Sequence, residues 1–386
     1  MTTISGPVKA LMVRLKAFRE AAGLTPEQIE ERLILGPGWV ASFEAGKTTP
    51  TIGMILAILS LFGKNINDLV RDLPTQEPAQ QLERQVNAEA KGENLLIRFS
   101  YADHDAAYEL PKARVQEFDQ VLKALRDGLS RLANPTDGGQ AIKTDAVANA
   151  FLKAVRLWPH GNPSDLWWFV ISRAYCDPYN HPAKFARMDF SQSWKRTGGW
   201  ALEEVLVRHY SPFLKTKGIN LFIAASETKE NLLKTVFVDE RLEAAKADVL
   251  LTTGAGKNER LLGVVHVKAS FAERRTDDVP MSRALIRAGY VSPLWTMDCK
   301  SMPAPQPQNR GELGVVLFAT NDGRSAKRKD IEDDGYFSAC FSYNHRTAPT
   351  PADQKSKAKI TVCNFRNPDD EFSAFIVREC RRILKK

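Results

Sequence analysis

Residues 248–282 read DVLLTTGAGKNERLLGVVHVKASFAERRTDDVPMS, and this stretch decides the fold of the larger part of the chain. A short apolar run follows Asp248, and a second run, Leu261–Val267, ends at Lys268. The Gly-rich segment Gly254–Gly256 between the two runs favours a turn, so the pattern predicts two consecutive strands. Such a pair would bring Asp248 and Lys268 to one end of a sheet.

The residue types at this predicted sheet end suit the hydrolysis of a phosphodiester. A carboxylate such as Asp248 binds Mg²⁺, and a lysine such as Lys268 can orient or activate a water molecule. Polar residues fill Glu273–Asp278, where Arg side chains suit guanine edges and Asp side chains can accept from cytosine N4. The stretch therefore predicts a metal-dependent nuclease whose base-reading residues follow its active site. The alternatives are a plain surface lysine at a strand end and a solvated, charged start of a helix.

Composition bounds the class of protein. The chain has 386 residues, of which 43% are hydrophobic and 26% charged, enough for two or three soluble domains. Its 54 Lys and Arg exceed its 46 Asp and Glu by eight, a balance that favours phosphate-bearing partners without requiring them. No apolar run reaches the roughly 18 residues of a membrane span, and the amphipathic N-terminus lacks the apolar core of a signal peptide.

The cysteines and histidines predict no structural zinc. The five cysteines are scattered, and neither a CxxC pair nor a zinc-like histidine spacing occurs; they are Cys176, Cys299, Cys340, Cys363 and Cys380. Free thiols are typical of the cytoplasm, where we expect this protein.

The first 73 residues have the pattern of a compact helical block. Thr25, Pro26 and Gln28 form a capping-box pattern at the start of one predicted helix. Apolar spacing and turn residues predict five helices, over 8–22, 26–33, 39–45, 52–62 and 66–73.

The phrases LKAFREAAGLTPEQIEERL and SFEAGKTTPTIGMILAILSLFGKNINDLV in this block resemble the Cro/XRE-type helix-turn-helix domain. The resemblance implies that the third helix enters the major groove, with Trp39 and Lys47 as candidate DNA contacts. Gly36, Pro37, Gly38 and Trp39 stand where polar base-reading side chains usually lie. The alternative is a domain used for packing or dimer contacts.

The rest of the chain has three predicted parts. Residues 74–92 are polar and Pro/Gln-rich, which indicates a linker that turns helical near its end. Residues 93–139 predict a hairpin and an amphipathic helix, either an interaction or dimerisation module or an extension of the next domain. Residues 140–386 alternate helices and strands, which predicts an α/β domain. Its expected helices cover 144–157, 200–214 and the C-terminus; its expected strands cover 219–225, 235–238, 248–252, 261–267 and 314–319. Residues 299–310 and 323–335 are expected loops.

The arrangement of Asp248 and Lys268 on two consecutive strands resembles the active-site motif of the PD-(D/E)XK nucleases. This superfamily includes most type II restriction endonucleases. The resemblance implies a mixed sheet flanked by helices, with two carboxylates and a lysine at one sheet edge. Asp248 matches the first carboxylate and Lys268 the lysine. His266 stands two residues before the lysine, where the family has Glu or Asp, and it would tune the site or pack.

The CCGG-cutting branch of these endonucleases takes the missing carboxylate from a helix. Glu203 and Glu204 are the candidates here, and both are possible metal ligands. Glu204 would pair with Arg208 at i+4 on a solvated face, whereas Glu203 shares its face with Val207 and is favoured as the inward ligand. Two surface glutamates are the alternative.

The same branch reads CCGG with an Arg/Asp-rich segment after the lysine. The amino-acid sequence of this segment here most resembles that of the BsaWI-like endonucleases. The resemblance makes this segment the candidate DNA-reading surface, consisting of Ser270, Glu273, Arg274, Arg275, Asp277 and Asp278.

The sequence thus predicts a Mg²⁺-dependent type II restriction endonuclease with an N-terminal helix-turn-helix. It would cut double-stranded DNA at a palindrome with a CCGG core and leave 5′-phosphate ends, using no nucleotide cofactor. A palindrome implies a homodimer, with a tetramer as the alternative. Two other functions stay open, a helix-turn-helix regulator with a C-terminal sensor domain and a repair or methylation-directed nuclease.

Overall fold

The computed structural model describes residues 6–45, 47–48, 50–71, 86–101, 104–133, 139–175, 190–234, 236, 244–270, 275–299, 311–314 and 324–385. The chain divides into two compact units, Met1–Leu82 and Glu83–Lys386. The described residues of the first unit form helices and turns only, and the second unit combines two β-sheets with helices.

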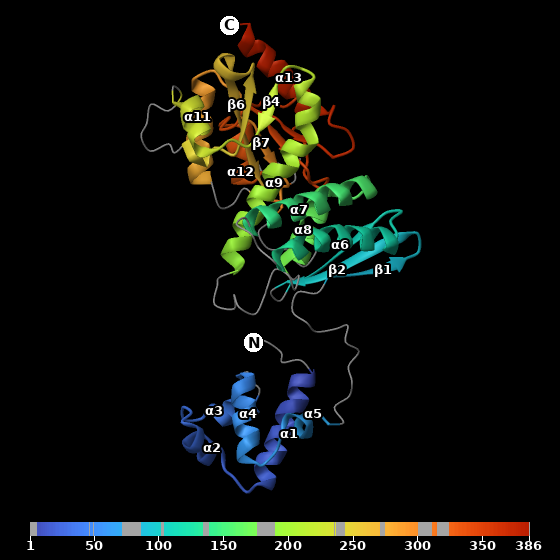
Figure 1. Cartoon of the computed structure of the whole chain (residues 1–386), viewed down its shortest axis with the longest axis vertical. Coiled ribbons are helices and arrows are strands. Elements are labelled where there is room, and N and C mark those ends of the chain that lie inside the picture. The colour runs from blue at the N-terminus through green and yellow to red at the C-terminus, as the bar shows by residue number, and fades with distance from the viewer. Residues whose placement is uncertain are drawn as a thin grey trace. The chain divides into compact units, whose positions relative to one another are not determined.

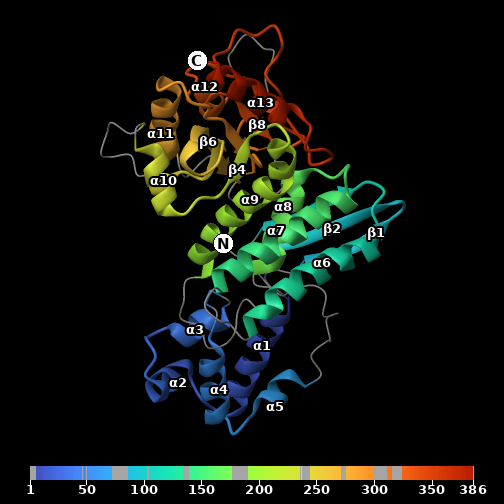
Figure 2. The same cartoon turned by 45° about the horizontal axis from the view of Figure 1, so that its top comes forward.

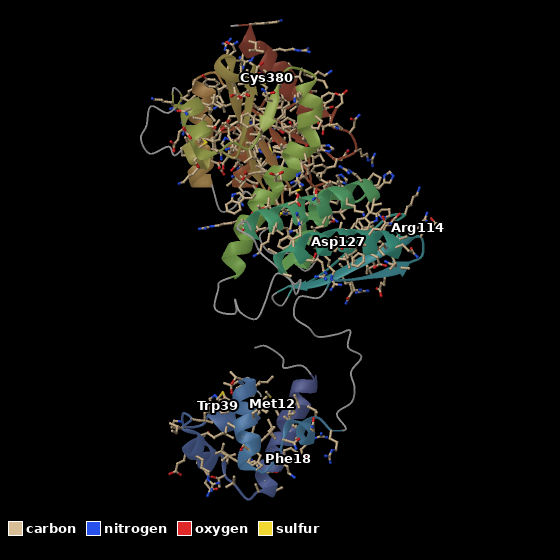
Figure 3. The ribbon with its side chains drawn as sticks, in the orientation of Figure 1. Met12, Phe18, Trp39, Arg114, Asp127 and Cys380 are labelled. Atoms are coloured by element: carbon tan, nitrogen blue, oxygen red, sulfur yellow. The ribbon has the colours of Figure 1, made fainter. Side chains whose placement is uncertain are left out.

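The N-terminal unit contains the five predicted helices, α1 (Gly6–Ala21), α2 (Pro26–Leu33), α3 (Trp39–Glu44), α4 (Ile52–Leu61) and α5 (Ile66–Val70). The predicted capping box is confirmed, because the Thr25 hydroxyl accepts from the Gln28 amide and the Gln28 side chain accepts from the Thr25 amide. Met12 of α1 is buried in the core of the unit, with Phe18 and Trp39 packed against that core (Figure 3). Arg19 Nε lies 2.6 Å from Glu44 Oε1 and ties α1 to α3.

The second unit begins with a three-stranded antiparallel sheet, β1 (Val86–Lys91), β2 (Asn94–Tyr101) and β3 (His104–Leu110). Strand β1 lies at the end of the segment expected to be a linker. The helical end predicted there is wrong, because residues 86–91 pair with β2 as a strand. Helix α6 (Val115–Ser130) follows and packs with α7 (Gly139–Leu157) and α8 (Pro163–Tyr175) over this sheet. Helices α6 and α7 share one core with the rest of the unit, so the described part of residues 93–139 packs with the larger domain.

A six-stranded mixed sheet carries the rest of the unit (Figure 1). Its strands lie in chain order, with antiparallel pairing from β4 to β6 and parallel pairing from β6 to β9. They are β4 (Asn220–Phe222), β5 (Val249–Thr253), β6 (Arg260–Lys268), β7 (Leu294–Thr296), β8 (Cys340–Ser342) and β9 (Ile360–Val362). This mixed sheet flanked by helices confirms the predicted fold class.

Both faces of the six-stranded sheet are covered, because β5 and β6 alternate their apolar side chains between two cores. Val249 and Val265 face the core shared with α9 (Phe190–Lys215) and α13 (Glu371–Leu384). Leu250 and Val264 face the core formed with α10 (Ser226–Leu233) and α11 (Arg275–Arg287). Figures 1 and 2 both show α11 on one side of β6 and α9 on the other.

Two glycines permit the close approaches on which this sheet depends. Gly254 has a φ of 77°, and a Cβ added there would lie 2.3 Å from the Asn258 carbonyl oxygen, so the β5–β6 turn needs glycine. A Cβ on Gly263 would lie 2.0 Å from the Val291 carbonyl oxygen. The bare Gly263 therefore lets residues 291–293 run directly beside β6.

Several predicted elements differ from the structure. Strands β7, β8 and β9 were not predicted, because each has only three residues and shows no alternation. The expected charged loop 323–335 contains the helix α12 (Ala326–Glu332), capped by Ser325. Helix α9 runs through Gly198 and Gly199 and so begins ten residues before the expected start. Most of the expected strands at 235–238 and 314–319 lies outside the described residues.

Two predictions of composition can be compared with the described part of the chain. None of its helices has the combination of length and apolar character that crossing a bilayer requires. Four cysteines are buried free thiols, Cys299, Cys340, Cys363 and Cys380, and Cys176 lies outside the described residues.

Candidate active site

Strands β5 and β6 bring Asp248 and Lys268 together, as the sequence predicts. Val249 pairs with Val265 in antiparallel register, so the start of β5 lies beside the end of β6. Asp248 Oδ2 accepts a hydrogen bond of 2.7 Å from Lys268 Nζ and one of 2.8 Å from the Val267 amide. Both side chains are buried. The ion pair therefore lies where β5 begins and β6 ends, and the backbone pairing of these two strands holds both residues in place.

Helix α11 adds a second carboxylate, from Asp278. This residue was expected to read DNA bases, but in the structure its side chain is buried and lies within the site. Its Oδ1 lies 3.3 Å from Lys268 Nζ. Burial raises the pKa of Asp278, but His266 and Lys268 outweigh burial, and the net pKa lies below the ordinary value. Asp278 is therefore an anion at neutral pH.

His266 lies between these groups and a pair of buried serines. Its ring is fully buried, and its Nε2 lies 3.0 Å from Ser292 Oγ. Its Nδ1 points toward Asp278, at 3.7 Å from Oδ1. Ser292 reaches this position because Gly263 lets its segment run beside β6.

The cluster has the donor set of a metal site. One ligand atom each from Asp248, His266 and Asp278 lies within 4.8 Å of the others. Two atoms of the cluster, His266 Nδ1 and Asp278 Oδ2, are buried without a hydrogen-bond partner among the described residues. Buried polar atoms are normally paired, so these two atoms fit a site that a cation completes.

Glu203 and Glu204 lie on α9, with different surroundings. Glu203 is 9% exposed and so faces inward, as its helical phase predicts. Glu204 Oε2 accepts a 2.8 Å bond from Arg208 Nε, which confirms the predicted i+4 pair. Arg208 also lies 3.0 Å from Asp145, so Glu204 belongs to a partly exposed ion-pair network. Neither glutamate falls in the close cluster around Asp248 within the described part of the chain.

The candidate DNA-reading segment is only partly described. Glu273 and Arg274 lie outside the described residues, and Arg275 and Asp277 are described only as members of α11. Ser270 donates a 3.0 Å hydrogen bond to Glu312, which also pairs with Lys327 at 2.7 Å. Ser270 thus connects the end of β6 to the segment that precedes α12.

The helix-turn-helix candidates lie on and beside α3. Trp39 stacks on Phe43 with ring centroids 5.7 Å apart and packs against the core, so its ring supports the helix. Lys47 is exposed. Glu30 accepts from the amides of Gly38 and Val40, at 2.9 and 2.7 Å, and caps the start of α3 with a buried carboxylate.

The sequence-based prediction did not place Asp278 beside Asp248 and Lys268, although a signal was present. Asp278, Met281 and Leu285 recur at intervals of three and four residues, which is the spacing of one helix face. Met281 and Leu285 are buried under the sheet, and Asp278 continues their stripe toward Lys268. A run of six polar residues obscured this inward face.

Known proteins resemble both units. Residues 10–69 match the family described as a helix-turn-helix domain. The chain is 40% identical over 243 residues to the type II restriction enzyme AgeI of Thalassovita gelatinovora, an alignment covering 61% of this chain and 84% of that enzyme.

Two solved structures are similar to this chain. The crystal structure of a specific AgeI–DNA complex aligns with a TM-score of 0.60 and 34% identity, covering 76% of this chain and 99% of AgeI. A pre-specific BsaWI–DNA complex aligns with a TM-score of 0.31 and 15% identity over 69% of this chain and 94% of BsaWI.

Proposed function

Since the chain belongs to the type II restriction endonucleases, we propose that it hydrolyses double-stranded DNA at a palindrome with a CCGG core. The reaction would depend on Mg²⁺ and leave 5′-phosphate ends. The observation that carries the proposal is the buried ion pair of Asp248 and Lys268, with Asp278 beside it, at one edge of the sheet. Two carboxylates can hold a divalent cation and a lysine can orient the attacking water, so these three groups suit metal-dependent phosphodiester hydrolysis.

The residues at this edge fit a divalent cation. Asp248 and Asp278 would hold the ion, and the unpartnered Asp278 Oδ2 is a buried oxygen with capacity for it. Bound there, Mg²⁺ would polarise the scissile phosphate and lower the pKa of a water molecule. Asp278 would then supply, from α11, the helix carboxylate that the CCGG-cutting branch uses. Glu203 stays a candidate for an outer ligand on α9.

The chain's own residues would arrange the attack. The Lys268 ammonium lies between the two carboxylates, 2.7 Å from Asp248 and 3.3 Å from Asp278. It would orient the attacking water toward phosphorus and compensate the charge that gathers on the phosphate. The Val267 amide fixes Asp248 through a 2.8 Å hydrogen bond, so this carboxylate is preorganised before DNA binds.

The DNA-reading role is proposed for the segment between Lys268 and α11. Glu273, Arg274, Arg275 and Asp277 would face base edges, whereas Asp278 turns inward. Arg forks would read guanine O6 and N7, and Asp or Glu would accept from cytosine N4. Because the segment follows Lys268 directly, base reading and hydrolysis would be coupled within one stretch of chain. A palindromic site would require two copies, one for each strand.

Purified protein should be incubated with unmethylated phage DNA and Mg²⁺, and the ends of any fragments sequenced. We expect discrete fragments that share a palindromic CCGG core and carry 5′-phosphates. EDTA and the Asp248→Ala variant serve as controls, and neither should yield fragments. Fragments lacking a common sequence would contradict site specificity. Intact DNA at every metal and salt concentration, with binding still seen by gel shift, would favour the regulator.

A further inference from the structure

We propose that His266 binds the catalytic metal ion directly through Nδ1, as a third protein ligand beside Asp248 and Asp278. The inference rests on the proposed metal-dependent function and concerns which atoms hold the ion. His266 stands two residues before Lys268, on the same strand and the same side of it, where the superfamily has an acid. A histidine there changes the chemistry of the site, because imidazole is a softer ligand than carboxylate.

The hydrogen bonds behind the ring determine its tautomer. Ser292 Oγ donates to Ser282 Oγ at 2.7 Å, and Ser282 Oγ donates to the Ser292 carbonyl. The Ser292 hydroxyl has therefore used its proton, so in its 3.0 Å contact with His266 Nε2 it must accept. The proton of a neutral ring is then on Nε2, and Nδ1 carries a lone pair. This is the usual preparation of a metal-ligating histidine, in which a second group fixes the other nitrogen.

The lone pair on Nδ1 faces other acceptors. Asp278 Oδ1 is 3.7 Å away, longer than a hydrogen bond, and Nδ1 has no hydrogen-bond partner among the described residues. The ring is fully buried, so water does not reach it from bulk solvent. An unpartnered lone pair beside a carboxylate is unfavourable unless a cation lies between them.

The spacing of the three groups suits one ion. Two ligands at about 2.1 Å from an ion lie about 3.0 Å apart when adjacent in an octahedron and about 4.2 Å apart when opposite. The Nδ1–Oδ1 separation of 3.7 Å lies in this interval, and all three ligand atoms lie within 4.8 Å of one another. A small inward movement of Asp248 or Asp278 would complete the coordination.

The net charge of the cluster also favours a bound cation. Asp248 and Asp278 carry two negative charges and Lys268 one positive charge, so with a neutral imidazole the buried cluster has a net charge of −1. Either a metal ion or a proton on Nδ1 would compensate it. The protonated ring is the rival explanation. It would point a proton at Asp278 and supply the part of that carboxyl's lowered pKa that comes from His266, and it predicts that His266 contributes nothing to metal affinity.

The proposal is tested by metal binding to the full chain without DNA. Mn²⁺ is titrated and its free concentration followed by electron paramagnetic resonance, and Co²⁺ is titrated and followed by visible absorption. The His266→Gln variant keeps a polar group near Ser292 but removes the Nδ1 ligand. We expect the unmodified protein to bind one ion per chain, and His266→Gln to bind both metals at least about tenfold more weakly.

Two further variants separate ligation from fold. Ser292→Ala leaves the imidazole in place and frees its orientation, so it should weaken Mn²⁺ binding less than His266→Gln does. His160→Gln changes an exposed histidine on the turn before α8 and should bind as the unmodified protein does. Unchanged near-UV circular dichroism in each variant shows that the fold persists.

A direct readout comes from the histidine rings themselves. In protein labelled with ¹⁵N-histidine, Zn²⁺ should shift the Nδ1 resonance of one ring, and the same shift should be missing in His266→Gln. Equal Mn²⁺ and Co²⁺ affinity in His266→Gln and the unmodified protein would overturn the proposal, as would no binding by the unmodified protein. Failure to cleave DNA, with metal binding still dependent on His266, would count against the proposed function alone.

Discussion

Asp278 Oδ1 lies 3.3 Å from Lys268 Nζ, so α11 delivers a carboxylate to the end of strand β6. The helix begins only seven residues after Lys268, at Arg275, and Asp278 occupies its first turn. In the proposed function, this helix carboxylate takes the place of the one that the superfamily carries on the strand, because Asp278 reaches Lys268 from α11. The position two residues before Lys268 is thereby released for His266.

We expect Asp278→Asn to lower the rate of DNA cleavage at least about a hundredfold, a loss of about 3 kcal/mol of transition-state stabilisation. The amide has the shape of the carboxylate but cannot compensate a cation or the Lys268 charge. Cleavage is measured in single turnover, and DNA affinity is measured separately in the absence of metal. Affinity should stay within a few-fold of the unmodified protein, since Asp278 faces inward.

Asp353→Asn is the matched control for this variant. Asp353 is exposed in the same unit, and its substitution should leave cleavage unchanged. Full cleavage by Asp278→Asn would show that Asp278 has no role in catalysis, and the alternative interpretation of this segment as a charged start of a helix would then hold.

The sequence could predict the site's strands and lysine because their signals are local. One apolar run begins after Asp248, the next ends at Lys268, and a glycine turn joins them, which is sufficient to place both residues at one end of the sheet. Asp278 and Ser292 could not be placed in this way, since each reaches the site by crossing over the sheet or running beside it. Strand β7 has three residues, and its place beside β6 depends on Gly263, which shows in the sequence only as one glycine in a strand.

The helices of the N-terminal unit were predictable to within three residues at each end, because helix caps and apolar spacing are local features of the sequence. Thr25 and Pro26 fix the start of α2, and the predicted span 26–33 is the observed one. The capping of α3 by Glu30 was not predicted, because it joins residues of different helices.

Substitutions of Glu203 and Glu204 should have different effects. Glu203→Gln alters a buried carboxylate on α9, and we expect cleavage to fall about tenfold or more if it is an outer metal ligand. Glu204→Gln breaks a partly exposed ion pair with Arg208, which should cost less than about 1 kcal/mol of stability and leave cleavage unchanged. Cleavage rates and thermal midpoints of the two variants are compared side by side. Equal cleavage by both would assign Glu203 to packing.

In the helix-turn-helix, Trp39 and Lys47 should separate stability from DNA binding. Trp39→Ala removes a ring stacked on Phe43 and should lower the stability of this unit by about 2 kcal/mol, seen as a shift of one calorimetric transition of the full chain. Lys47→Ala should instead weaken DNA binding at low salt and reduce the dependence of log affinity on log salt by about one.

Neither of these two substitutions should change the cleaved sequence. On α3 and the turn before it, Gly36, Pro37, Gly38 and Ala41 are exposed, and none of them has a side chain that can hydrogen-bond a base edge. A shift in the flanking bases of the cleavage site in Lys47→Ala would contradict this view and assign base reading to the unit.

Asp298 should make stability fall as pH rises. It lies two residues after β7, where its Oδ1 accepts from the amides of Glu312 and Leu313 at 2.6 and 3.1 Å. Burial raises its pKa to about 6, against the opposing effect of the Thr347 hydroxyl and these amides. The folded protein therefore binds this proton more tightly than the unfolded chain, whose Asp pKa is about 3.9. The stability that this tighter proton binding adds to the folded protein is fully present below about pH 4 and is lost as pH rises through about 6.

The Asp298→Asn variant keeps the shape of the side chain and the acceptor for both amides, but it does not titrate. A pKa difference of about 2 corresponds to about 3 kcal/mol, so the variant should gain up to about that much stability relative to the unmodified protein between pH 4 and pH 7. Guanidinium unfolding of both proteins at several pH values measures the difference. Carboxylates with lowered pKa, such as Asp278, act in the opposite direction but are common to both proteins and cancel. A stability difference that stays constant from pH 4 to pH 7 would show that Asp298 does not titrate in this range, and its carboxylate would then be held by the Glu312 and Leu313 amides as a permanent anion.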